Sequence, residues 1–283
     1  MNVIIFLNGI TYAGLLFMCA SGLTLIFGLM KVVNMSHGIF YLTGAYLGMT
    51  VKNITGNWFL GIIAGGIAVA VIAVLLKLTL FDRVLGDPMQ ETLLTLGINL
   101  IIGDALLAIY GGVPQSITAA KAFSRTLNLG FVSYPRIRLF ILLVAILEGV
   151  GLFLLISKTR IGQYIRAGVN DKMMTSALGI NINMVFTFVF ILGGLLAGIS
   201  GVMGGSYLAF NPGFDSTILT YSLVVVIVGG IGSLSGAALG SALVGLIDSY
   251  TKASVPNLSM VIIFGVLMLV LAFKPNGLLG REG

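Results

Sequence analysis

Long uncharged stretches dominate the hydrophobic pattern of this chain and predict membrane-spanning helices. A helix needs about 20 apolar residues to cross the hydrocarbon core of a bilayer. Helical spans read as continuous apolar runs, whereas strands of a membrane barrel alternate. Runs with at most one charge occupy residues 1–30, 32–51, 53–76, 92–112, 139–157, 173–214, 216–247 and 253–273. The pattern predicts an all-α membrane protein, a single transmembrane domain over 1–283 built as a polytopic bundle of about eight or nine segments.

One of these runs is too long for a single span and is interrupted by glycines. Residues 216–247 contain Gly229, Gly230 and Gly232, followed by Ser233. Two interrupted apolar segments in corresponding halves of a chain point to the substrate site of a transporter. Irregular backbone at membrane depth is tolerated only where it lines a cavity or packs against protein. We therefore expect broken or re-entrant helices and a two-half repeat.

The matching interruption in the first half is the stretch VVNMSHGIFYLTGAY at residues 32–46. On a continuous helix, Asn34, His37 and Tyr41 share one face with two glycines at G-x-x-x-G spacing. Two interpretations stay open: hydrogen bonding between helices of the bundle, or a transport path bordered by this stripe and the glycine break. We expect Ser36 to bond a carbonyl one turn back in its own helix.

Polar side chains inside other spans are further candidates. Thr95 and Asn99 share one helical face and extend the candidate path, while Asp104 and Glu148 are the carboxylates expected well inside spans. An intramembrane carboxylate is a functional candidate by default. The alternative is a carboxyl that is protonated, or paired with a donor inside the bundle.

Composition narrows the class of protein. Only 8% of the residues are charged, against about 25% in soluble domains, so no soluble domain is expected. The single histidine and the single cysteine, Cys19, leave no metal cluster and no internal disulfide. The sequence contains no complete catalytic motif, so we expect no enzymatic activity, cofactor or metal. The net charge of +6 fits basic flanks facing lipid and needs no nucleic-acid partner.

The basic residues orient the spans through the positive-inside rule. The proposed cytoplasmic side comprises the loops at 77–91 and 158–183, the turn at Lys31 and the C-terminal tail. With this orientation, the N-terminus lies outside the cytoplasm. It holds nine cations, against six opposite: Lys52, Lys121, Arg125, Arg136, Arg138 and Lys252.

The segment at 158–183 is expected to form a cytoplasmic loop with a short helix. Asn170 can cap its start, Asp171 suits the helix dipole, and Gly179 can end it. Its apolar side carries Met173, Met174 and Leu178. Such a face suits docking into the groove of another protein. The alternative is an interfacial helix lying on the membrane.

Four segments carry a family resemblance. They are GLTLIFGLMKVVNMSHG (22–38), TRIGQYIRAGVNDKMMTSALGIN (159–181), VVVIVGGIGSLSGAALGSALVGLI (224–247) and KPNGLLGR (274–281). In this order and spacing, they resemble the permease subunits of branched-chain amino-acid (Liv-type) ABC importers. The chain departs from the usual family pattern at Asn170, at Met35-Ser36 and at Asp87-Pro88.

The resemblance implies a multi-pass permease of the bacterial inner membrane that translocates branched-chain or related amino acids. Its partners would be a second permease subunit (a paralogue or a second copy), two cytoplasmic ATP-binding-cassette ATPases and a periplasmic substrate-binding protein. The candidate path comprises Asn34, His37, Gly38, Tyr41, Thr95, Asn99, Gly229, Gly230, Gly232 and Ser233. The ATPase-coupling residues would be Arg166, Asp171, Met173, Met174, Leu178, Gly179 and Asn181.

Three alternatives remain beside this hypothesis. Permeases of this type also handle urea and short amides. An ion-coupled secondary transporter would use Asp104 or Glu148 instead of ATP. A membrane-embedded assembly factor would transport nothing.

Overall fold

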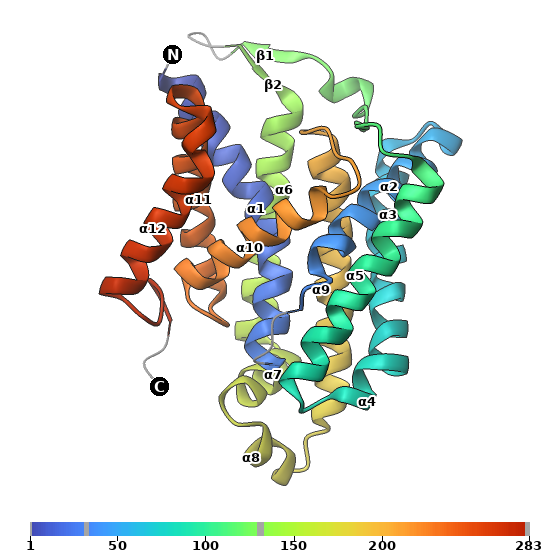
Figure 1. Ribbon diagram of the computed structural model, residues 1–283, viewed down its shortest axis with the longest axis vertical. Helices are drawn as coiled ribbons and strands as arrows, with labels where there is room; N and C mark the ends of the chain where they lie inside the picture. The colour runs from blue at the N-terminus through green and yellow to red at the C-terminus, as the bar shows by residue number, and fades with distance from the viewer. Residues whose placement is uncertain (1, 31–33, 129–132, 281–283) are drawn as a thin grey trace.

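The helical fold class predicted from the sequence is confirmed by a computed structural model, which describes residues 2–30, 34–128 and 133–280 (Figure 1). Within these ranges, six segments are long and apolar enough to cross a membrane. Four of them are single helices: α1 (Asn2–Met30), α5 (Pro88–Tyr110), α6 (Arg136–Lys158) and α9 (Ile182–Gly205). The fifth, Trp58–Val84, consists of α3 (Trp58–Leu76), η1 (Lys77–Phe81) and α4 (Asp82–Val84). The sixth, Pro256–Phe273, consists of η3 (Pro256–Leu258) and α12 (Ser259–Phe273).

Two further features complete the bundle. Helix α2 (His37–Thr55) spans 19 residues. Helices α10 (Phe214–Gly229) and α11 (Leu234–Ser254) form a pair bent by 119° at the glycine break. With α2 and this broken pair counted, the described part of the chain approaches the predicted eight or nine segments. The predicted broken helix is present.

Helices α1 and α9 form the centre of the bundle. Their apolar windows are 61% and 67% buried, against 17% for α5 and α6 and 11% for the α12 segment. Glycines allow the central helices to approach closely, because a Cβ at Gly44 of α2 would lie 2.5 Å from the Gly198 Cα of α9. The apolar outer faces of α5, α6 and α12 are left for lipid or for another subunit.

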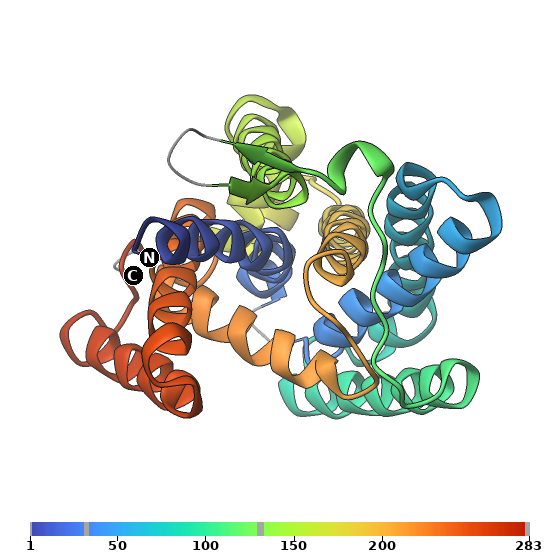
Figure 2. The ribbon, with the colours of Figure 1, turned by 90° about the horizontal axis from the view of Figure 1, so that it is seen from above.

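The two ends of the bundle differ (Figure 1). The lower end in Figure 1 carries α4, α7 (Arg160–Asn170) and α8 (Lys172–Ala177), all within the loops predicted to be cytoplasmic. The other end carries η2 (Lys121–Phe123) and a hairpin of β1 (Thr126–Asn128) and antiparallel β2 (Ser133–Pro135). Figure 2 shows the connection from α5 crossing this end to reach the hairpin above α6. Lys31 and Arg281, which contribute to the orientation prediction, lie outside the described residues.

Candidate functional site

The polar stretch of the first half forms a turn that leads into α2. The Asn34 side-chain oxygen accepts hydrogen bonds from the Ser36 backbone N–H at 3.1 Å and from the Ser36 hydroxyl at 2.5 Å. The His37 N–H donates to the Asn34 carbonyl at 3.2 Å. The helix therefore begins at His37, and two predictions are wrong. Asn34 lies in the turn instead of on the helical stripe, and the Ser36 hydroxyl bonds the Asn34 side chain instead of a carbonyl one turn back.

Helix α5 holds this turn in place. The Met35 N–H donates to the Thr95 hydroxyl at 3.2 Å. One turn further along α5, the Asn99 amide donates to the Asp215 carboxylate at 3.3 Å, and Asp215 also accepts from the Gly213 N–H at 3.1 Å. Thr95 and Asn99 therefore link the start of α2 to the start of α10, as members of one site.

Gly38 permits the contact between α2 and α10. A Cβ on Gly38 would overlap the Asp215 carbonyl oxygen and would lie 2.9 Å from the Leu219 Cβ. Since backbone atoms cannot yield as a flexible side chain can, only glycine fits here. This close approach sets His37 and Tyr41 of α2 at the centre of the bundle.

The His37 side chain is completely buried, and one of its two ring nitrogens forms a hydrogen bond. Its Nε2 donates to the Cys19 carbonyl of α1 at 2.9 Å. A carbonyl can only accept, so the proton of a neutral ring sits on Nε2 and leaves Nδ1 as an acceptor. Nδ1 has no partner among the described residues, and neither has the Tyr41 hydroxyl one turn later.

Other unpaired polar atoms accompany them. The Asn34 Nδ2 and the Asn99 Oδ1 have no hydrogen-bond partner in the described structure. Each buried group of this kind costs about 1–3 kcal/mol when it is left unpaired. With His37 and Tyr41 they make four buried or half-buried side chains with an unpaired donor or acceptor, next to the Asp215 carboxylate that Asn99 contacts. We call Asn34, His37, Tyr41 and Asn99 the central polar cluster.

The glycine break of the second half lies elsewhere. Helix α10 ends at Gly229. In the turn that follows, Gly230 has a φ of 110° and Gly232 a φ of 74°. The Ser233 hydroxyl then caps α11 by accepting from the Gly236 N–H at 3.0 Å. A residue other than glycine is strained at such angles. The neighbours of the break include Gly28 of α1, Val169 of α7 and residues 276–280 of the C-terminal tail. None of these neighbours belongs to α2, and α10 runs from its contact with Gly38 to the break, so the predicted contact between the break and the α2 stripe is not observed among the described residues.

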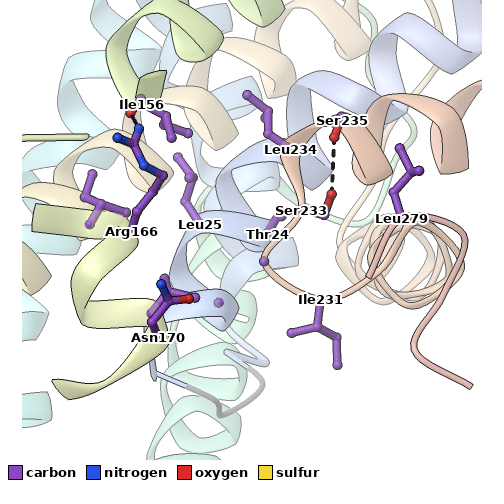
Figure 3. A pocket seen from close by; sticks show the side chains of 14 residues that line it. Thr24, Leu25, Ile156, Arg166, Asn170, Ile231, Ser233, Leu234, Ser235 and Leu279 are labelled. Carbon is purple, nitrogen blue, oxygen red and sulfur yellow. Dashed lines mark hydrogen bonds between the residues drawn. The ribbon is translucent and has the colours of Figure 1, made fainter. Parts of the chain in front are cut away.

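The break instead borders a cleft of about 550 Å³ (Figure 3). Arg166 and Asn170 of α7 line the cleft on one side, and residues 231–235 line it on the other. Arg166 donates to the Ile156 carbonyl of α6. A residue predicted for coupling and residues predicted for the path thus meet across one cleft at the α7–α8 end.

The coupling segment forms two short helices where one was predicted. Asp171, not Asn170, caps α8 by accepting from the Met174 N–H at 2.9 Å. The helical turns of α7 extend through Asn170, which shifts the cap by one residue. Gly179, with φ of 81°, ends the segment as predicted, and Asn181 caps α9 by accepting from the Met184 N–H at 3.1 Å.

An apolar surface faces outward at this end. Met173, Met174 and Leu178 are 84%, 62% and 73% exposed. Next to them, Tyr164 and Met184 border a groove of about 280 Å³. We call Met173, Met174 and Leu178 the methionine face. An apolar face of this kind at a membrane protein's aqueous end is typical of a docking surface.

The two predicted intramembrane carboxylates lie in different surroundings. Asp104 lies exposed on the outer side of α5, and Glu148 accepts from the Ser21 hydroxyl at 2.8 Å, which matches the interpretation of a carboxyl paired within the bundle. The structure also buries Asp215 and Asp248. Asp248 accepts from Tyr221, Ser259 and Lys252, the last at 2.8 Å. These two acids were missed because each lies next to an end of an uncharged run. Among the described residues, no three potential metal ligands gather.

Comparisons with known proteins agree over nearly the whole chain. The family model for the branched-chain amino acid transport system permease component matches residues 5–271. The high-affinity branched-chain amino acid transport system permease protein BraD of Pseudomonas aeruginosa is 28% identical, covering 97% of this chain and 94% of that protein. LivH of Escherichia coli K12 is 27% identical with the same coverage.

Similarity extends to an archaeal relative and to one solved structure. The probable branched-chain amino acid transport permease LivH of Methanocaldococcus jannaschii is 27% identical over 97% of this chain and 91% of its own length. PsaBC from Streptococcus pneumoniae, solved in complex with Fab, superposes with a TM-score of 0.51 at 14% identity, covering 95% of this chain and 91% of that one. At that identity the match supports the fold alone.

Proposed function

Because this chain belongs to the family of branched-chain amino acid transport system permease components, we propose that it translocates branched-chain or related amino acids across the bacterial inner membrane. It is a multi-pass transport subunit of an ABC system rather than an enzyme. Its proposed partners are two cytoplasmic ATPases, a second permease subunit and a periplasmic substrate-binding protein.

The central polar cluster is the observation that carries this proposal. It supplies a ring acceptor from His37, a hydroxyl from Tyr41, an amide donor from Asn34 and an amide acceptor from Asn99, all unpaired. Neutral donors and acceptors suit the charged groups of a zwitterionic amino acid. Asp215, the acid beside Asn99, already accepts hydrogen bonds from the Asn99 amide and the Gly213 N–H. A solute passing through would also relieve the cost of the unpaired atoms.

The exposed surfaces support the proposed assembly. The methionine face offers an apolar docking surface to a cytoplasmic ATPase. The sparsely buried helices α5 and α12 offer apolar faces to a second permease subunit and to lipid. The cleft is lined by α7, the helix that precedes the methionine face in the chain, and by α1 and the glycine break of the bundle.

Uptake by the reconstituted complex tests the proposal. The permease, purified with its ATPases and partner permease, is placed in proteoliposomes with an amino-acid-binding protein of the same organism. We expect labelled leucine, isoleucine and valine to be taken up only with ATP and the binding protein. Equal uptake without ATP would favour an ion-coupled transporter. Uptake of urea or acetamide in their place would assign the permease to those solutes.

A matched pair of variants connects uptake to the cluster. His37→Leu removes the ring nitrogens, and uptake should fall by about tenfold or more, equivalent to about 1.4 kcal/mol in the barrier, while assembly and ATP hydrolysis persist. Thr43→Val is the control, because the Thr43 hydroxyl bonds the Ile39 carbonyl of its own helix at 2.7 Å. Equal effects of the two variants would separate the cluster from transport.

A further inference from the structure

The end of the bundle opposite α7 and α8 has an unusual charge balance. No acidic residue occurs between Asp104 and Glu148, whereas this stretch contains four basic residues: Lys121, Arg125, Arg136 and Arg138. Extracytoplasmic loops generally carry few Lys and Arg residues. The proposed orientation places this stretch outside the cytoplasm, so its positive charge runs against the topological trend.

Two of these arginines lie beside each other at the base of the hairpin. The Arg136 N–H donates to the Arg125 carbonyl at 3.1 Å, next to the paired residues Thr126 and Pro135. Like charges placed opposite each other on antiparallel strands destabilise the pairing. Both arginines and Lys121 are exposed, and no ion pair joins any of them to a described acid. No ion pair with a described acidic residue therefore offsets the repulsion between these cations.

Arg138 has a different role within the same stretch. It donates to the Asn8 side-chain oxygen, and its guanidinium lies 5.0 Å from the centroid of the Tyr207 ring. These contacts tie α6 to α1 and to the loop after α9. Arg138 therefore belongs to the packing of the bundle, which leaves Lys121, Arg125 and Arg136 as the outward cations.

The bundle holds the segment that carries these cations. Gln115 and Phe210 exchange two backbone hydrogen bonds of 2.8 and 2.9 Å, and the Ile117 N–H donates to the Gly205 carbonyl at 2.8 Å. The buried Tyr134 hydroxyl lies 3.0 Å from that of Thr11 on α1. A surface that is ordered before binding loses less entropy when a partner docks.

We infer that Lys121, Arg125 and Arg136 form a docking site for an acidic surface of the protein that delivers the substrate. This inference rests on the proposed function, which places this end outside the cytoplasm. Arginine pairs bidentately with carboxylates, so two neighbouring exposed arginines suit carboxylates on the surface of a partner. Lipid binding is less well matched, because polybasic lipid sites use about four to eight cations against the anionic cytoplasmic leaflet.

Charge reversal in the assembled transporter tests the docking site. The complex in nanodiscs is titrated with the substrate-loaded amino-acid-binding protein at low and high salt. Arg125→Glu combined with Arg136→Glu should weaken binding by about tenfold or more, mostly through slower association, and salt should reduce the difference. The double exchange of both arginines for lysine should retain most of the affinity. Lys52→Glu, at the same end but on α2, should change it by less than about threefold.

Any of four results would overturn the inference. The first is unchanged affinity of the double glutamate variant in an assembled complex, and the second is an equal loss with Lys52→Glu. The third is loss of capture by phosphatidylglycerol vesicles with protein binding unchanged, which would assign the cations to lipid. A wild-type complex that takes up amino acids without any binding protein would overturn the docking site and leave the transport proposal intact. Absence of uptake under every condition would overturn the proposed function itself.

Discussion

Gly28 of α1 and Gly232 of the α10–α11 turn cross with no side chain between them, and a Cβ at Gly28 would lie 2.8 Å from the Gly232 Cα. The Val169 side chain of α7 lies within 3.8 Å of the Cβ position of each glycine. Val169 thus links α7 to the junction of α1 with the broken helix pair, at the edge of the cleft in Figure 3, and a displacement of α7 would act directly on that junction.

Gly28→Ala should disturb this junction. The added methyl group meets backbone, so the turn must shift, at a cost of about 1–3 kcal/mol. We expect a lower melting temperature in detergent and slower ATP-driven uptake. Gly97→Ala on α5 is the control, because a Cβ there meets nothing within 4 Å, and alanine favours a helix over glycine by up to about 1 kcal/mol. Equal melting temperatures and uptake for the two variants would show that the crossing tolerates a side chain.

The methionine face should be the ATPase contact. Met174→Glu or Leu178→Asp places a charge on this exposed apolar surface, and burying an unpaired charge in an interface is strongly unfavourable. We expect copurification with the ATPase to be lost while membrane insertion is retained. Ile54→Glu is the control, since Ile54 is 79% exposed at the opposite end of the bundle. ATPase recovery equal to wild type in all three variants would contradict the assignment.

The sequence predicts the fold more completely than the site. Continuous apolar runs identify the spans, and the helix break at Gly229–Gly232 follows from residues whose backbone preferences are local. The docking of the turn before α2 onto α5 does not follow, because the Met35 N–H donates to Thr95, which lies 60 residues away in sequence. Likewise, the burial of Asp215 depends on Asn99 of another helix. Contacts of this kind leave no periodic signal in a single sequence.

Asp104 and Glu148 should not couple transport to protons. Asp104→Asn and Glu148→Gln should each retain ATP-driven uptake within a few-fold, since glutamine keeps an acceptor for the Ser21 hydroxyl and Asp104 lies on the exposed side of α5. The measurement is initial uptake normalised to assembled complex. Loss of uptake with normal assembly would restore the ion-coupled alternative.

The central polar cluster should become accessible to water during transport, and cysteine labelling can detect this. His37 and Tyr41 are 0% and 1% exposed, so a charged thiol reagent can reach them only when the path opens. In a Cys19→Ser background, cysteines at positions 37 and 41 should react during ATP-driven turnover and remain protected without ATP. A cysteine replacing Thr43, which is also buried, should stay protected in both conditions because it lies on the opposite helical face. Ile54→Cys should react throughout and confirm that the reagent is active. Equal labelling at 37, 41 and 43 during turnover, or none at any of them, would mean that the cluster packs the bundle and does not border a path.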